Sequence, residues 1–223
     1  MNSCVYLDIG NSNTKWKFEG EYFEIPTHKF NLDKLPKSSK IWVSNVSSNF
    51  VINQKSNVVS IESQKRYKSL INSYEEPNKL GLDRWLAMIA AYEMNSKNGF
   101  IVVDIGTAVT IDLVDKYAHH IGGVIFPGLL KIRNTFDYFP VLEEINAKML
   151  GQSTKAAWSI GTLSLISNGI NQKIHDIQAS YPDTDIYLTG GGANEISKFL
   201  DFSYDYYKNL VLDGLELFAN NMG

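Results

Sequence analysis

The chain has 223 residues, of which 44% are hydrophobic and 20% charged, as in globular proteins with one large domain or two smaller ones. A formal net charge of −3 and an isoelectric point near 5.8 argue against a nucleic-acid-binding surface, which needs clustered basic residues. The single cysteine, Cys4, excludes an intramolecular disulfide. The sequence has neither a signal-peptide pattern nor an apolar stretch of the roughly 18 residues that span a bilayer. It therefore predicts a cytoplasmic protein without membrane contact.

The first half of the chain predicts strands followed by a helix. Four short apolar runs have the length and composition of strands: Val5–Ile9, Thr14–Phe18, Ile41–Val46 and Val58–Ile61. The first two are separated by residues 10–13, which predict the tip of a hairpin. Arg84–Met94 has apolar residues at helical spacing and is followed by Asn98-Gly99, so it predicts a helix.

The second half repeats this order. Its predicted strands are Phe100–Asp104, Thr110–Val114, Ile121–Phe126 and Ile186–Thr189. Its predicted helices are Leu129–Leu150, Lys155–Ala179, Ala193–Leu200 and Leu210–Asn220. Two halves with the same order of elements predict an α/β protein of two related domains, residues 1–98 and 99–223. The predicted boundary is the polar, glycine-containing segment 95–99.

One seven-residue pattern occurs in both halves, at Asp8–Thr14 (DIGNSNT) and at Asp104–Thr110 (DIGTAVT), with Asp, Gly and Thr at the same offsets. An aspartate at the end of an apolar strand needs a cation or hydrogen-bond donors to offset its burial. Glycine lets the backbone approach a ligand closely, and successive turn amides cradle phosphate oxygens. Ordinary hairpin turns also use Asp, Gly and Asn. Two matched copies nevertheless favour a shared anionic ligand, such as a nucleotide with its metal.

The tetrapeptide Gly81-Leu82-Asp83-Arg84 stands at the start of the clearest predicted helix. Asp83 suits a general base that accepts the proton of a substrate hydroxyl as its oxygen attacks phosphorus. Arg84 suits a two-pronged hydrogen bond to a substrate carboxylate. The alternative is that Asp83 only caps the helix and that Arg84 is solvated. One aspartate can serve both as a cap and in a site, so the two interpretations stay open.

Three further segments have both a functional and a structural interpretation. Gly190–Gly192, between a predicted strand and helix, allows a nucleotide base or ribose to pack on bare backbone, but also suits a tight turn. It lacks the spacing of the dinucleotide fingerprint, and the chain has no Walker-type phosphate loop. Thr154 suits an N-cap. The adjacent His119 and His120 predict a solvated hairpin end, because neighbouring strand residues point to opposite faces.

Taken in chain order, these motifs resemble those of the type III pantothenate kinases. The matching segments are Asp8–Ser12 with D-x-G-N-[TS], Tyr74–Pro77 with Y-x-x-P, Gly81–Arg84 with G-x-D-R, Asp104–Ala108 with D-x-G-T-A, Gly122–Gly128 with G-G-x-I-x-P-G, and Thr189–Ala193 with the last glycine motif. Ser153–Trp158 matches the N-T-x-x-A-[IV] element loosely, with Ser153 in place of Asn. Ser12 stands where Thr is commoner. The ordered set spans most of the chain and is specific, although each motif alone is weak.

The resemblance implies a fold of two ribonuclease-H-like domains, as in the actin and sugar-kinase superfamily, with a nucleotide cleft between them. It implies ATP-dependent phosphorylation of pantothenate to 4'-phosphopantothenate, the first step of coenzyme A biosynthesis. Family members are typically homodimers whose substrate pocket is completed across the interface. Magnesium accompanies ATP, and a monovalent cation, potassium or ammonium, is also expected.

The resemblance also implies roles for individual residues. Asp83 matches the catalytic base, and Asp104 matches the residue that holds the monovalent cation. The positions expected at the phosphates of ATP are Asp8, Ile9, Gly10, Asn11, Ser12, Asn13, Thr14, Lys15 and Thr107. The positions expected to contact pantothenate are Tyr74, Gly81, Leu82, Asp83, Arg84 and Thr154.

Two other functions compete with this expectation. The first keeps the fold but changes the acceptor to another small hydroxy acid or a sugar. The second is a non-catalytic nucleotide-binding regulator. The presence of Asp8, Asp83, Arg84 and Asp104 argues against the regulator, because a protein without catalysis is free to lose them.

Overall fold

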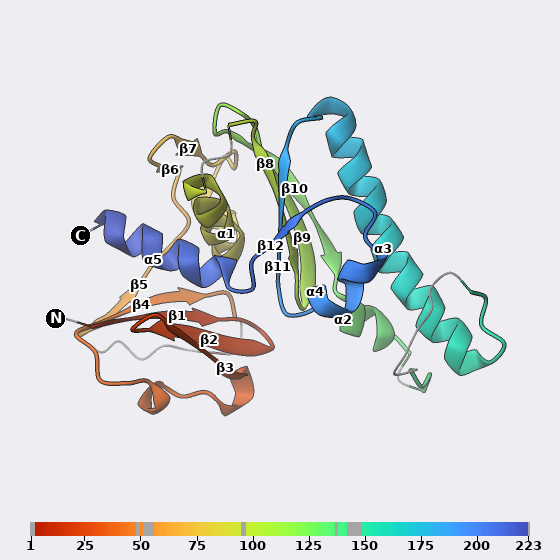
Figure 1. Ribbon diagram of the computed structural model, residues 1–223. Helices are drawn as coiled ribbons and strands as arrows, with labels where there is room; N and C mark the ends of the chain where they lie inside the picture. Colours follow the sequence, from red (N-terminus) through yellow and green to blue (C-terminus); the bar gives the residue numbers. More distant parts are fainter. Residues whose placement is uncertain are drawn as a thin grey trace. The chain divides into compact units, whose positions relative to one another are not determined.

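The computed structural model describes residues 3–47, 50, 56–94, 97–136, 138–141 and 149–222. The chain divides into two compact units, and Figure 1 shows the two five-stranded sheets on which they are built. The first unit consists of residues 1–97, 116–122 and 209–223. The second consists of residues 98–115 and 123–208.

The first sheet has the strand order β3-β2-β1-β4-β5. Its strands are β1 (Cys4–Ile9), β2 (Asn13–Phe18), β3 (Glu21–Pro26), β4 (Lys40–Asn45) and β5 (Val58–Ser60). The first three strands pair antiparallel, whereas β4 and β5 run parallel to β1. Val5, Leu7 and Ile9 alternate along β1 and are fully buried, because successive side chains of a strand point to opposite faces.

Two helices of the first unit, α1 (Leu82–Glu93) and α5 (Leu210–Met222), pack on each other and contact strands of its sheet. Their contact is close at Gly214, where a Cβ atom would lie 1.9 Å from the carbonyl oxygen of Leu86. The shorter elements of this unit are β6 (Arg66–Tyr67), β7 (Leu70–Ile71) and the 3-10 helices Thr27–Lys29, Leu32–Lys34 and Pro77–Lys79.

The second sheet has the strand order β10-β9-β8-β11-β12. Its strands are β8 (Phe100–Ile105), β9 (Ala108–Val114), β10 (His120–Pro127), β11 (Asp185–Thr189) and β12 (Asp205–Tyr206). The helices of the second unit are α2 (Leu129–Arg133), α3 (Thr154–Ser180), α4 (Ala193–Ile196) and the 3-10 helix Ser197–Phe199. Ile166, Ile170 and Ile174 of α3 are buried in one core with Ile101 and Val103 of β8. In the part of the chain that the structure describes, no helix is long and apolar enough to cross a membrane.

The structure confirms the predicted strands and most of the helices, but the helix predicted for Leu129–Leu150 is wrong in its described part. Helix α2 ends at Arg133, and residues 134–136 and 138–141 are turns and irregular chain. Pro140 disfavours a helical conformation at the residue before it. Phe136 and Phe139 instead pack on Trp158 of α3, with ring centroids 5.5 and 5.2 Å apart. The rest of the predicted segment, residues 142–148, lies outside the described residues.

Four strands were not predicted: β3, β12 and the two-residue strands β6 and β7. The side chains of β3 are nearly all exposed, so its sequence has no buried alternation to reveal it. It is held by its pairing with β2 and by Phe23, whose ring stacks on Trp16 with centroids 5.3 Å apart. Two residues of β12 pair with β11, too few to leave a pattern.

The domain boundary between residues 98 and 99 stays a prediction. The compact units are less simply divided, because residues 116–122 and 209–223 belong to the first unit and residue 98 to the second. Helix α5 buries Leu212, Leu215 and Phe218, and Phe218 stacks on Tyr67 with centroids 6.3 Å apart. An amphipathic helix at the end of a sequence does not reveal which core its apolar face will cover.

The close contact of Gly214 with α1 leads to a testable prediction about stability. Gly214→Ala places a methyl group against rigid backbone, so we expect the free energy of unfolding to fall by about 1–3 kcal/mol. The matched control is Gly169→Ala in α3, where no heavy atom lies within 4 Å of the added Cβ, and there we expect a gain of about 0.5–1 kcal/mol. Urea unfolding measures both variants. Equal stabilities would contradict the close packing of α1 on α5.

Candidate active site

The first Asp-Ile-Gly turn connects β1 and β2 in the first unit. Ile9 pairs with Thr14, so Gly10–Asn13 form a four-residue loop between them. The Gly10 amide donates to the carbonyl oxygen of Asn13 at 3.0 Å, and a Cβ on Gly10 would lie 2.9 Å from that oxygen. The side chains of the loop, Asn11, Ser12 and Asn13, are exposed. The loop therefore presents polar side chains to a ligand on a tightly closed backbone.

Two residues at the base of this loop have different surroundings. Asp8 pairs directly across from Lys15, which places the carboxylate and the ammonium group on the same face of the sheet. Thr14 is fully buried, and its hydroxyl lies 3.1 Å from the hydroxyl of Thr27. Thr27 in turn donates to the carbonyl oxygen of Gly10 at 2.8 Å. In this conformation Thr14 braces the loop from inside, and a direct contact with phosphate stays a prediction.

The second Asp-Ile-Gly turn connects β8 and β9 in the second unit, and it is one residue shorter. Ile105 pairs with Val109, and the Gly106 amide donates to the carbonyl oxygen of Ala108 at 2.9 Å. Asp104 is half-buried and lies between Thr110 of β9 and Thr189 of β11 in the register of the sheet. The matching threonines of the two repeats therefore take different places relative to their aspartates.

Backbone from two later glycine segments lies against this second turn. Gly190 has a φ of +97°, and a Cβ there would lie 2.3 Å from the oxygen of Ile105 and 2.4 Å from Oδ1 of Asp104. Gly128 donates its amide to the carbonyl oxygen of Thr107 at 3.0 Å, and a Cβ there would lie 2.3 Å from the oxygen of Gly106. Any side chain at either position would displace the turn.

Tyr206 adds an electrostatic contact to Asp104 that the sequence did not reveal. Burial raises the pKa of the Tyr206 hydroxyl, and the negative charge of Asp104 raises it further. The phenol therefore stays protonated through the neutral range. Because Tyr206 stands in the short strand β12, no sequence pattern connected it to the second turn.

The start of α1 carries the predicted catalytic aspartate. The N-cap is Gly81, not Asp83, and the carboxylate oxygen Oδ1 of Asp83 accepts the backbone amide of Arg84 at 2.8 Å. A carboxylate at this end of a helix is stabilised by the helix dipole. Asp83 is half-buried, so its side chain is neither locked in the core nor fully solvated.

The Arg84 guanidinium lies in a small aromatic cluster of the first unit. The side chain is buried, so the alternative of a solvated Arg84 is wrong. Its Nη1 donates to the hydroxyl of Tyr74 at 3.1 Å, and its Cζ lies 5.9 Å from the centre of the Tyr74 ring. The third member of the cluster is His120, whose ring stacks on Tyr74 with centroids 6.1 Å apart.

The prediction of a solvated histidine pair is therefore wrong for His120, which is buried, and right for His119, which is exposed. The amide of Ile71 donates to the carbonyl oxygen of Ala118 at 2.8 Å, which brings the start of β10 beside residues 71–74. Nδ1 of His120 lies 3.1 Å from the hydroxyl of Ser73. The sequence around His120 could not predict this contact, because Ser73 lies 47 residues away along the chain.

Asn72 is a supporting residue that sequence reasoning missed. Its side chain is fully buried, its Oδ1 accepts the amide of Tyr74 at 3.0 Å, and its Nδ2 donates to the carbonyl oxygens of Gln64 and Pro77. These bonds fix the loop that carries Tyr74. No sequence pattern pointed to Asn72, because its burial and its partners are visible only in the fold.

A cavity of about 290 Å³ lies beside the start of α1 in the first unit. Its lining includes Gly81 and Leu82, which the family resemblance places at the substrate, together with Asn45, Glu62 and Asn78. Asn45 ends β4, one of the parallel strands, and ligands of α/β sheets bind outside the carboxyl ends of such strands.

Thr154, the remaining predicted substrate position, is the first residue of α3 in the second unit. It is exposed, and it is not the N-cap. The cap is Ser153, whose side chain accepts the amide of Ala156 at 3.2 Å. The Thr154 hydroxyl is therefore not engaged as a cap.

The donor set suits a cation held mainly by a bound phosphate. Among the residues that the structure describes, no group of three or more His, Cys, Asp or Glu side chains is arranged to hold a metal. Asp104 offers a half-buried carboxylate beside turn carbonyls, and oxygen ligands of this kind suit hard cations. Magnesium commonly takes one or two carboxylates and completes its shell with substrate phosphates and water. The half-buried Asp104 carboxylate and the nearby turn carbonyls fit a cation whose shell is completed by phosphate and water.

Comparison with known proteins identifies the family. A model described as "Type III pantothenate kinase" matches residues 4–176. The chain belongs to the type III pantothenate kinase family. A type III pantothenate kinase from Hahella chejuensis is 33% identical, with 96% of each chain covered. Another from Marinobacter nauticus is 30% identical, with 97% of this chain and 98% of the relative covered.

Solved structures agree with this assignment at the level of fold. A protein from Campylobacter jejuni, described as a candidate Baf family transcriptional activator, has a TM-score of 0.69 at 25% identity, with 98% of each chain covered. A candidate 2-dehydro-3-deoxygalactonokinase from Sinorhizobium meliloti has a TM-score of 0.59 at 12% identity, also with 98% of each chain covered. An archaeal actin homologue has a TM-score of 0.54 at 10% identity, with 98% of this chain and 99% of that chain covered. The predicted actin and sugar-kinase fold is confirmed.

The Tyr74–Arg84 contact makes a testable prediction about the stability of this pantothenate kinase. Tyr74→Phe removes an acceptor of a buried guanidinium, so we expect the free energy of unfolding to fall by about 1.5–3 kcal/mol. Tyr117→Phe is the control, because that ring is 67% exposed, and we expect a change within about 0.5 kcal/mol. Chemical denaturation measures both. An unchanged Tyr74→Phe protein would show that the bond contributes nothing.

Proposed function

We propose that this type III pantothenate kinase transfers the γ-phosphoryl group of ATP to the primary hydroxyl of pantothenate, with Asp83 as the general base. The single observation that supports this role is the place of Asp83. Its half-buried carboxylate stands at the start of α1, two residues from a cavity-lining glycine and next to a buried arginine. No other carboxylate of the family motifs has such neighbours in the first unit.

The reaction places simple demands on these residues. As the hydroxyl oxygen attacks the γ-phosphorus, its proton passes to the Asp83 carboxylate and the bond to the ADP oxygen breaks. Phosphoryl transfer depends mainly on positioning and charge neutralisation, so the base needs to be held in line with the attacking oxygen. The bond from the Arg84 amide to Oδ1 of Asp83 fixes the orientation of the carboxylate at the start of α1.

Arg84 and Tyr74 are proposed to recognise the carboxylate of pantothenate. An arginine that is already oriented by a tyrosine hydroxyl loses little freedom on binding a carboxylate. Gly81 and Leu82, which line the 290 Å³ cavity, are proposed to contact the rest of the acceptor. Thr154 of the second unit is proposed as a further hydrogen-bonding contact.

The residues from Asp8 to Lys15 and Thr107 are proposed to contact the phosphates of ATP. The support is the exposed polar loop Gly10–Asn13, the ammonium group of Lys15 across from Asp8, and the backbone turn at Thr107. Magnesium bound with ATP supplies neutralisation of phosphate charge. Asp104 is proposed to hold a potassium or ammonium ion, and its support is the half-buried carboxylate against the bare backbone of Gly190.

The family resemblance also leads us to propose a cytoplasmic homodimer. In such a dimer the partner copy completes the substrate pocket, which accords with the exposed position of Thr154. Sedimentation velocity of the purified kinase tests the oligomeric state, and a monomer at assay concentration would contradict it.

Substitution of the proposed base is the direct test of the mechanism. In Asp83→Asn we expect kcat to fall about 10²- to 10⁴-fold, because the amide cannot accept the proton, while ATP affinity changes little. Asp183→Asn, an exposed aspartate of the second unit, is the matched control and keeps full activity. Coupled ADP release and nucleotide titration measure the two quantities. An unchanged kcat in Asp83→Asn would remove the residue from the mechanism.

Replacement of potassium by sodium tests the proposed role of Asp104. We expect the pantothenate-dependent rate to fall about tenfold, a loss of ~1.4 kcal/mol, when the larger ion is withdrawn. In Asp104→Asn the rates in the two salts become equal, because the charge that holds the ion is gone. Equal rates in the wild-type kinase would contradict a bound potassium ion.

A further inference from the structure

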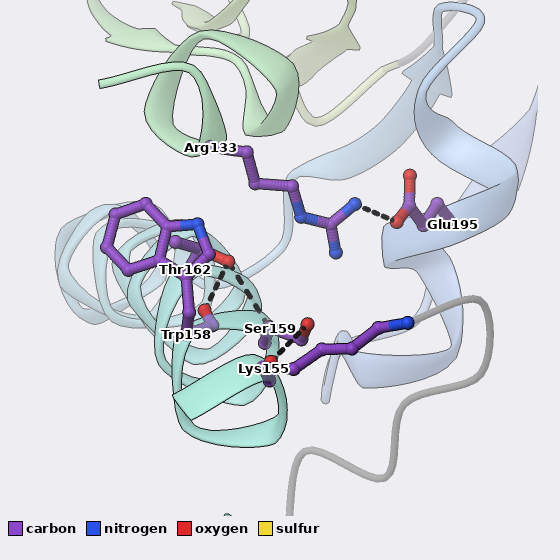
Figure 2. A network of polar contacts seen from close by, with 6 residues as sticks. All are labelled: Arg133, Lys155, Trp158, Ser159, Thr162 and Glu195. Atoms are coloured by element: carbon purple, nitrogen blue, oxygen red, sulfur yellow. Dashed lines mark hydrogen bonds and ion pairs between the residues drawn. The ribbon is translucent and has the colours of Figure 1, made fainter. Parts of the chain in front are cut away.

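An ion pair between a buried arginine and an exposed glutamate connects two short helices of the second unit. Figure 2 shows the Arg133 side chain extending from the end of α2 to Glu195 of α4, beside the first turns of α3. Nη1 of Arg133 lies 2.6 Å from Oε1 of Glu195. The arginine is buried, with 8% of its side chain exposed, whereas the glutamate is 48% exposed. Neither residue belongs to a motif that the family resemblance used.

The surroundings make Glu195 the main anchor of this guanidinium. Within the described part of the chain, Nε and Nη2 of Arg133 are buried without a hydrogen-bond acceptor. The nearby hydroxyls of Ser159 and Thr162 donate instead to carbonyl oxygens of their own helix, at 2.8 Å to Lys155 and Trp158 respectively (Figure 2). A buried charge with one partner is costly when that partner is lost.

Both helices joined by the pair begin at glycines that lie on the second Asp-Ile-Gly turn. Gly128, the N-cap of α2, donates to the oxygen of Thr107 at 3.0 Å. Gly192, the N-cap of α4, donates to the oxygen of Ile105 at 2.8 Å. Each helix is about one turn long, so an ion pair at the far end of α2 restrains the glycine at its start.

The contacts form a closed ring. It runs from Thr107 through Gly128 and α2 to Arg133, crosses to Glu195, and returns through Gly192 to Ile105. We propose that the Arg133–Glu195 ion pair is a positioning device that holds the Asp104–Thr107 turn in the conformation that binds ATP. This inference rests on the proposed function, in which Asp104 and Thr107 act on the nucleotide and its cation. In this proposal Arg133 and Glu195 are positioning residues, which act through the turn.

The ion pair predicts a specific kinetic signature. When the turn is ordered in advance, ATP binding does not have to select a minor conformation. If loss of the pair leaves about one tenth of the molecules in the competent conformation, the KM for ATP rises about tenfold. The kcat at saturating ATP and the KM for pantothenate change little, because the base and the acceptor site lie on other elements.

The experiment compares Arg133→Met, Glu195→Gln and the reversed pair Arg133→Glu with Glu195→Arg. Arg133→Met replaces the charge by an apolar chain of similar length, whereas Glu195→Gln leaves the buried guanidinium without its carboxylate. We therefore expect Glu195→Gln to be the less stable protein in urea. The KM for ATP nevertheless rises about tenfold in both, and the reversed pair restores it to within about threefold of wild type. Asp176→Asn, which breaks the exposed Lys173–Asp176 pair of the same unit, is the control and changes nothing.

The proposal is overturned if the KM for ATP is unchanged in Arg133→Met. It is also overturned if the KM for ATP rises in the variants only in proportion to their loss of stability in urea. The third contrary result is a reversed pair that does not recover the wild-type KM for ATP. The affinity of each protein for a fluorescent ATP analogue, measured without pantothenate, separates this failure from that of the proposed function. If the wild-type protein binds the analogue but does not phosphorylate pantothenate, the proposed function fails. The effect of Arg133→Met on analogue affinity still decides the role of the ion pair.

Discussion

The close approach of bare backbone to the turn that follows β8 is the constraint on which the second unit depends. Gly190 and Gly128 lie so near the turn that a methyl group at either position would sit 2.3 Å from a backbone oxygen. These contacts hold Asp104 and Thr107 in place without any side chain between the turn and its supports. A phosphate-binding surface needs this arrangement, because backbone amides and a few polar atoms must reach the ligand unobstructed.

The two copies of the repeated motif differ in structure. The first turn is a four-residue loop with exposed polar side chains, and its threonine is buried beneath it. The second is shorter, and the threonine at the same offset lies directly across from its aspartate. The first copy thus suits contact with a ligand through side chains, and the second through backbone and a carboxylate. The proposed base, Asp83, belongs to neither copy.

Local sequence patterns were enough to predict most of the secondary structure and the family. Strands with buried alternation and helices with apolar periodicity were predicted, and the ordered motifs identified the family. Long-range contacts were not predictable: His120 is buried because β10 brings it to Tyr74, and α5 joins the first unit because its apolar face meets α1. The helix predicted after Gly128 was too long for a related reason. Phe136 and Phe139 pack on Trp158 of α3, and the local sequence does not reveal this contact. The N-cap of α3 is Ser153, one residue before the predicted position.

The central property of this kinase is that ATP turnover is coupled to a hydroxyl acceptor that carries a carboxylate. The most direct measurement follows ADP and phosphorylated product together, by coupled assay and mass spectrometry, after purified protein is mixed with ATP, magnesium and pantothenate. The account predicts one ADP for each 4'-phosphopantothenate and almost no ADP without the acceptor. ATP consumption that does not respond to pantothenate would contradict it.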